Sequence, residues 1–89
     1  MKRLVDMLKR HEGVKTHAYK DHLGYVTVGV GRCLEADVGL GLSEDEIDYL
    51  LKGDISRCRE ELEKEYSWFG ALDTVRKEAL IDLSFNVGQ

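Results

Sequence analysis

The chain has 89 residues, of which 13 are Lys or Arg and 17 are Asp or Glu, so its formal net charge at pH 7 is −4. This length predicts one domain with a small core. The acidic balance argues against nucleic-acid binding and gives no electrostatic attraction to anionic cell-wall polymers. No apolar run approaches the roughly 20 residues of a membrane span, and the charged N-terminus lacks a signal peptide. We therefore expect a soluble chain without membrane insertion.

The chain begins with a pattern that predicts a short amphipathic helix over residues 2–11. Leu4, Val5 and Leu8 recur at helical spacing, with Lys and Arg between them. Gly13 follows the pattern directly, and a glycine in this position is typical of a helix end.

Two strands are predicted next, at residues 18–19 and 25–30. The second is the stronger prediction, because its alternating β-branched side chains fit a pleated sheet. Turn-forming residues at 20–24 join the two strands into a hairpin. Residues 33–42 predict a loop with room for one more short strand.

The second half of the sequence predicts two helices. Ser43 opens an S-x-x-E capping box, and an apolar stripe from Ile47 to Tyr66 follows it. Asp73 is placed to cap a last helix over residues 74–87. The order of helix, small antiparallel sheet, long helix and further helix indicates an α+β fold.

Motifs for a metal or a cofactor fail on their spacing. His11 and His17 lie six residues apart with a glycine between them, whereas a helical zinc motif needs four. GVGRCL has Leu34 where a dinucleotide loop has its third glycine. Cys33 and Cys58 have no metal spacing and are expected to be free thiols in the core. The sequence thus predicts neither a metal site nor a cofactor.

Glu12, Asp21 and Thr27 are the strongest candidates for chemistry. Leu4, Leu8 and Glu12 share one helix face, so the Glu12 carboxyl group is expected at the rim of the core. Partial desolvation favours the protonated form that a general acid needs. A hairpin that folds back on the helix end would bring a second carboxylate and a hydroxyl to the same cleft, which suits glycoside hydrolysis. Each residue also fits an ordinary surface, turn or strand position.

The pattern E-G-x(5)-Y-K-D-x(2)-G-Y-x-T-x-G-x-G, from Glu12 to Gly31, resembles the active-site signature of the phage-type lysozymes, the endolysin group of glycoside hydrolase family 24. Residues 72–88, LDTVRKEALIDLSFNVG, are similar to the central helix of that family. The resemblance implies one lysozyme-like domain over residues 1–89, which comprises an N-terminal lobe and the start of a helical lobe. It also implies a peptidoglycan hydrolase, whose partners are the glycan strands of peptidoglycan.

The resemblance implies a role for each matched residue. Glu12 would be the general acid, and Asp21 would orient or activate the attacking water with help from Thr27. The β-1,4 bond between N-acetylmuramic acid and N-acetylglucosamine would be cleaved with inversion. Phe85 and Asn86 match positions that face the cleft, although core packing is an equally good interpretation of Phe85.

Three features depart from the family pattern. Arg32 stands where some members carry His, and its permanent charge suits binding of sugar or peptide groups or pairing with Asp21. The net charge is acidic, whereas many members are basic. The sequence stops at Gln89, whereas phage-type lysozymes usually continue with several more helices. A fragment of a longer enzyme, a complementing C-terminal chain and self-association of a minimal form all fit this departure.

Two further expectations follow from the resemblance. The alternative function is a catalytically incomplete lysozyme-like module that acts in cell-wall binding or assembly, or that needs a second chain for activity. In either case we expect synthesis in the host cytoplasm. The chain would then reach the cell wall or periplasm after another protein breaches the membrane.

Overall fold

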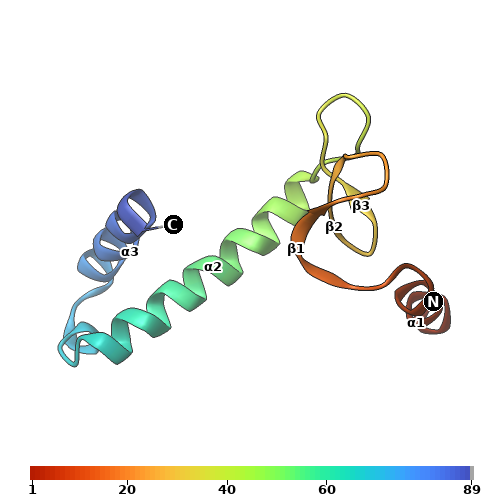
Figure 1. The fold of residues 1–89 in the computed structure, drawn as a ribbon. Coiled ribbons are helices and arrows are strands. Elements are labelled where there is room, and N and C mark those ends of the chain that lie inside the picture. Colours follow the sequence, from red (N-terminus) through yellow and green to blue (C-terminus); the bar gives the residue numbers. More distant parts are fainter. Residues whose placement is uncertain (89) are drawn as a thin grey trace. The chain divides into compact units, whose positions relative to one another are not determined.

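The computed structural model describes residues 1–88 and shows two compact units, Met1–Ser43 and Glu44–Gln89. The first unit contains helix α1 (Lys2–Glu12) and strands β1 (Lys15–Lys20), β2 (Val26–Gly29) and β3 (Arg32–Cys33). The second contains helix α2 (Glu44–Glu65), the short 3₁₀ helix η1 (Phe69–Ala71) and helix α3 (Thr74–Gly88) (Figure 1). This order confirms the predicted α+β fold. Within residues 1–88, no helix has both the length and the apolar character needed to cross a membrane.

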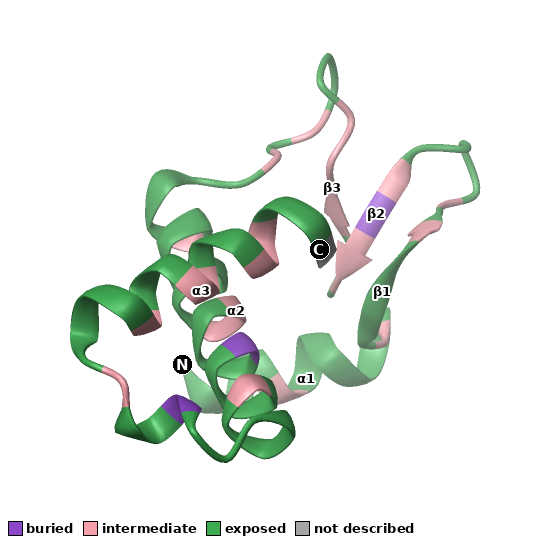
Figure 2. Ribbon diagram, turned by 90° about the vertical axis from the view of Figure 1, so that its left-hand side faces the viewer, coloured by how far each residue is buried: buried purple, intermediate pink, exposed green. Residues whose placement is uncertain are grey.

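Helix α1 ends at the glycine that the sequence predicted. The φ angle of Gly13 is 78°, a left-handed value that glycine adopts without steric cost, and its amide donates to the carbonyl of Lys9 at 3.0 Å. The expected burial of the apolar face is wrong, because Leu4 and Leu8 are each 42% exposed and α1 has no buried residue (Figure 2). Amphipathic spacing here therefore forms a helix without placing it in a core.

The sheet has the order β1-β2-β3, and both strand pairs are antiparallel. Strand β1 is longer than predicted, because its first residue, Lys15, pairs with Gly29. Strand β3 is the further short strand for which residues 33–42 left room, and it begins one residue earlier, at Arg32. Gly31, with a φ of 80°, makes the turn between β2 and β3.

The second unit begins where the capping box predicts, with α2 starting at Glu44. Asp73 caps α3 as expected, because its Oδ1 accepts a hydrogen bond from the backbone N–H of Arg76 at 2.8 Å. The buried apolar side chains of the described residues are Cys58, 7% exposed, and Phe69, fully buried. The predicted burial of Cys58 is therefore confirmed, and the core of this unit is thin.

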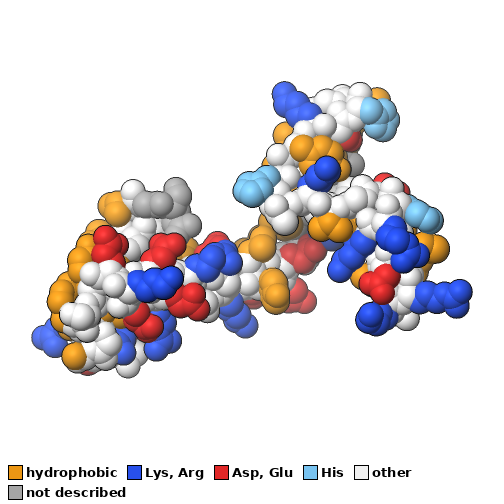
Figure 3. All heavy atoms as spheres, turned by 60° about the horizontal axis from the view of Figure 1, so that its bottom comes forward, with side chains coloured by type: hydrophobic (Ala, Val, Ile, Leu, Met, Phe, Trp, Pro, Cys, Tyr) orange, Lys and Arg blue, Asp and Glu red, His pale blue; other side chains and the backbone are white. Residues whose placement is uncertain are grey.

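Charge is divided unevenly between the two units. Residues 1–43 contain seven Lys and Arg against five Asp and Glu, a net charge of +2. Residues 44–89 contain six against twelve, a net charge of −6. Basic side chains gather on α1, and acidic ones are frequent along the helices of the second unit (Figure 3). The acidic character of the chain therefore belongs to the second unit.

Candidate functional site

Glu12 is the last residue of α1, and its side chain is exposed. The positive φ of Gly13 turns the chain out of the helix, and β1 begins two residues later, at Lys15. The prediction that Glu12 lies at the rim of a core is wrong, because the helix face that carries it is not buried. Its position at the junction of helix and sheet agrees with the sequence analysis.

Asp21 organises the turn between β1 and β2. Its Oδ1 accepts hydrogen bonds from the backbone amides of Leu23 and Tyr25, each at 2.9 Å. Its own amide donates to the carbonyl of Tyr25, also at 2.9 Å. Within residues 1–88, no donor hydrogen-bonds Oδ2. One carboxylate oxygen therefore holds the turn, and the other is the candidate for chemistry.

Thr27 lies in the middle of β2 and is 3% exposed. Its Oγ1 donates to the carbonyl of Tyr25 at 2.9 Å, the same oxygen that accepts from the amide of Asp21. Asp21 and Thr27 are therefore fastened to the backbone of one residue, Tyr25. The structure brings these two predicted residues together, and no hydrogen bond within the described chain ties Glu12 to either.

The register of β1 against β2 shifts between Glu12 and Asp21. Lys15 pairs with Gly29 and Tyr19 pairs with Thr27, so three residues of β1 oppose one residue of β2. An irregularity of this kind bends the strand and increases its twist. The ribbon of β1 curves accordingly between α1 and the hairpin turn (Figure 1).

Arg32 lies on the sheet face opposite Thr27. Thr27 pairs with Cys33 and Val28 with Arg32, and neighbouring residues of a strand point to opposite faces. The Arg32 guanidinium donates to the carbonyl of Gly41 at 2.9 Å and so fastens the loop that follows β3. Asp21 bonds to backbone amides rather than to Arg32. Binding of substrate by Arg32 stays a prediction.

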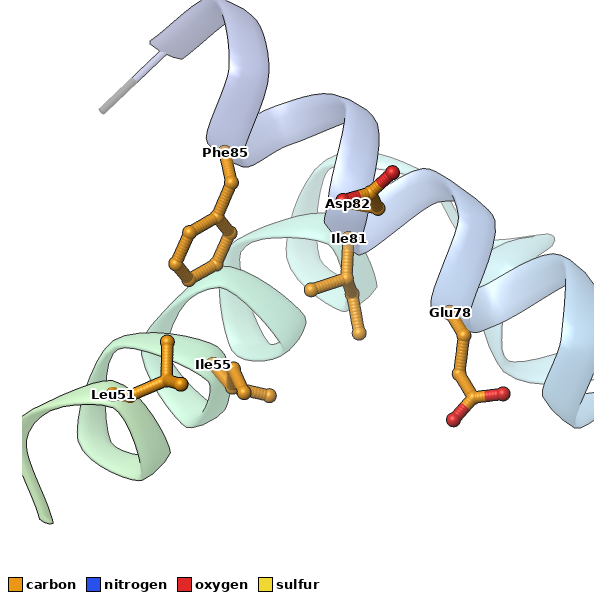
Figure 4. Close-up of a pocket in the computed structure, with 6 residues that line it drawn as sticks. All are labelled: Leu51, Ile55, Glu78, Ile81, Asp82 and Phe85. Carbon is orange, nitrogen blue, oxygen red and sulfur yellow. The ribbon is translucent and has the colours of Figure 1, made fainter. Parts of the chain in front are cut away.

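Phe85 and Asn86 lie on α3, in the second unit. Phe85 points toward Leu51 of α2 across an apolar groove of about 330 Å³ (Figure 4). The groove is also lined by Ile55, Glu78, Ile81 and Asp82. Phe85 is half-buried and lines this groove within the second unit, which favours the packing interpretation, whereas Asn86 is exposed. A role of either residue toward substrate stays a prediction.

Glu35 lies next to the candidate site, and the sequence analysis did not single it out. Its Oε1 accepts a hydrogen bond from the backbone amide of Val26 at 2.8 Å, next to Thr27. The sequence shows only an acid in a loop, so no local signal distinguishes it from its neighbour Asp37. Residues 1–88 contain no group of three or more His, Cys, Asp or Glu side chains arranged to hold a metal ion.

Comparisons with known proteins identify the family of the chain. The family model for phage lysozyme matches residues 9–89, a range that includes all the candidate site residues. The chain is also 29% identical, over 109 residues, to probable T4-type lysozyme 1 of Dictyostelium discoideum. That similarity covers 93% of this chain and 64% of the relative, so the chain spans less than two thirds of the relative's length. Because the family model matches most of the sequence, the chain belongs to the phage lysozyme family.

Proposed function

We propose that this chain is the catalytic part of a peptidoglycan hydrolase that cleaves the β-1,4 bond between N-acetylmuramic acid and N-acetylglucosamine. Membership of a family of glycoside hydrolases supports this function. The observation that carries it is the unequal use of the two Asp21 carboxylate oxygens. Oδ1 accepts hydrogen bonds from two backbone amides, and Oδ2 remains for a water. A carboxylate held in this way is oriented before substrate arrives.

In the proposed reaction, Glu12 gives its proton to the glycosidic oxygen as the bond from that oxygen to the anomeric carbon breaks. A water attacks the anomeric carbon from the opposite face and gives its proton to Asp21. Inverting enzymes need about 6.5–9.5 Å between the two carboxyl groups to leave room for this water. The irregularity in β1 lies in the strand that joins the two residues, and it bends that strand.

Thr27 assists through its oxygen rather than its proton. The hydroxyl proton is already donated to the carbonyl of Tyr25, so toward a water Oγ1 acts as an acceptor. An acceptor beside a carboxylate helps to point a lone pair of the water at the anomeric carbon. The burial of Thr27 keeps this oxygen fixed in the sheet.

Purified peptidoglycan tests the proposal. The 89-residue chain should release soluble muropeptides, and proton NMR of the early product should show the α-anomer that inversion predicts. Glu12→Gln should lower the rate by about 10²–10⁴-fold, because it removes the general acid without changing the shape of the side chain. Glu60→Gln, at an exposed position of α2, is the matched control. Equal rates for Glu12→Gln and wild type would refute the assignment of Glu12.

A second function is supported by the exposed apolar surface. Helix α1 has no buried residue, and the second unit buries only two apolar side chains among its described residues. We infer that a chain of this kind also suits a module that binds cell wall and needs a second chain to complete its cleft. Co-sedimentation with peptidoglycan, combined with no release of muropeptides by the chain alone, would favour this function over hydrolysis.

A further inference from the structure

Where β3 ends, a side-chain carboxylate replaces a backbone carbonyl as the acceptor of a sheet hydrogen bond. The amide of Leu34 still donates to the carbonyl of Val26 at 2.8 Å, as in an antiparallel ladder. The amide of Val26 does not return to the backbone of that strand, and donates instead to the carboxylate of Glu35 at 2.8 Å. The Glu35 side chain therefore takes the place of a strand carbonyl.

The amide that donates to Glu35 belongs to the same peptide group whose carbonyl accepts from Asp21 and Thr27. The carbonyl of Tyr25 and the amide of Val26 belong to one planar peptide unit and point to opposite sides of β2. On one side, the Tyr25 carbonyl accepts from the Asp21 amide and the Thr27 hydroxyl. On the other side, the Val26 amide is held by Glu35. A rotation of this peptide would move both predicted site residues.

We propose that Glu35 is a positioning residue, which orients the Tyr25–Val26 peptide and through it Asp21 and Thr27. The proposal rests on the proposed hydrolase function. The geometry carries it: the Glu35 acceptor lies on one side of the peptide, and the two predicted site residues are bonded to the other side.

The loop that carries Glu35 is itself held in place. The carbonyl of Glu35 accepts from the amide of Gly39 at 2.9 Å, and the carbonyl of Cys33 accepts from the amide of Gly41 at 3.2 Å. The guanidinium of Arg32 donates to the carbonyl of Gly41 at 2.9 Å. These bonds fix the backbone on both sides of Glu35, so its side chain meets Val26 without first ordering a flexible loop.

Two substitutions separate the reach of the Glu35 side chain from its charge. Glu35→Gln keeps an oxygen at the same distance and should retain at least about half of the wild-type rate, because the acceptor is preserved. Glu35→Asp keeps the charge but is one methylene shorter, and it should lower kcat about tenfold or more with little change in KM, since a small misplacement of a catalytic group is costly. Asp37→Glu, in the same loop and exposed, is the matched control.

Amide hydrogen exchange measured by NMR tests the connection from Glu35 through the Tyr25–Val26 peptide to Asp21 without any substrate. In Glu35→Asp, the amides of Val26, Tyr25 and Leu23 should all exchange faster, because the Asp21 turn loosens with the peptide. In Glu35→Gln and Asp37→Glu these amides should keep their wild-type rates. Faster exchange at Val26 alone, with Tyr25 and Leu23 unchanged, would overturn the proposal. If the wild type releases no muropeptides, the hydrolase function fails, and the exchange data still decide whether Glu35 positions Asp21.

Discussion

Asp21 holds a turn with one carboxylate oxygen and has a second oxygen for the chemistry that we propose. Its Oδ1 completes a turn by accepting two backbone amides, which is the usual function of Asp in such turns. This arrangement also fixes the direction of Oδ2, the oxygen that the proposed mechanism uses. The ordinary interpretation of Asp21 as a turn residue and the catalytic interpretation are therefore compatible, because each uses a different oxygen.

Two substitutions at Asp21 should separate these roles. Asp21→Asn keeps an oxygen acceptor for the amides of Leu23 and Tyr25, so its thermal stability should stay near wild type while muropeptide release is lost. Asp21→Ala removes the acceptor as well and should also cost about 1–3 kcal/mol of stability. Thermal unfolding followed by circular dichroism checks both variants. Wild-type stability of Asp21→Ala would show that the turn does not depend on the Oδ1 bonds, and equal loss of stability in both variants would contradict the expectation for Asp21→Asn.

Thr27 allows a similar test of the hydroxyl group. Thr27→Val is nearly isosteric, and the carbonyl of Tyr25 keeps its bond from the Asp21 amide, so the loss of stability should be only about 1 kcal/mol. The rate of muropeptide release should fall because the acceptor for the water is gone. Thr27→Ser retains the hydroxyl and should restore most of the rate. Identical rates for Val and Ser would remove Thr27 from the mechanism.

At the scale of elements, the loop after β3 depends on close packing of its backbone. A Cβ atom added at Gly39 would lie 2.7 Å from the carbonyl carbon of Cys33 and 2.9 Å from its Sγ. Gly39→Ala should therefore shift the loop and cost about 1–3 kcal/mol, as overpacking typically does. Gly70→Ala is the control, since no atom lies within 4 Å of a Cβ added there. Urea unfolding of the two variants measures the difference, and equal midpoints would contradict the expected clash.

The elements also show which features the sequence could predict. Gly13 and Asp73 act through neighbours within four residues, so local patterns found both helix ends. The extension of β1 to Lys15 depends on a pairing with Gly29, and the role of Glu35 on a contact with Val26. Such contacts join residues far apart in sequence, and propensity contains no information about them. Residue types and spacing made Asp21 and Thr27 candidates and the family pattern assigned their roles, whereas their common attachment to Tyr25 required the structure.

At the scale of the whole molecule, the candidate catalytic residues and the acidic charge lie in different units. Glu12, Asp21 and Thr27 belong to residues 1–43, whose net charge is +2, whereas residues 44–89 carry −6. The net charge of the chain predicted no attraction to anionic wall polymers. Because the positive and negative charges are distributed unequally between the units, an anionic polymer that approaches the first unit meets a weakly positive local surface.

The second unit depends on few buried side chains, and Phe69 is the only large one that is fully buried in the described chain. Phe69→Ala should cost about 3–5 kcal/mol, a large part of the 5–15 kcal/mol that typically stabilises a domain. Trp68, the only tryptophan of the sequence, adjoins it and reports unfolding of this unit by fluorescence. Phe69→Leu, the control, should cost less because most of the volume is kept. An unchanged fluorescence midpoint in Phe69→Ala would show that this unit is not stabilised by its small core.

Sheet amides followed by NMR in the same variant test the prediction of one domain over residues 1–89, because a single cooperative domain would lose both units together.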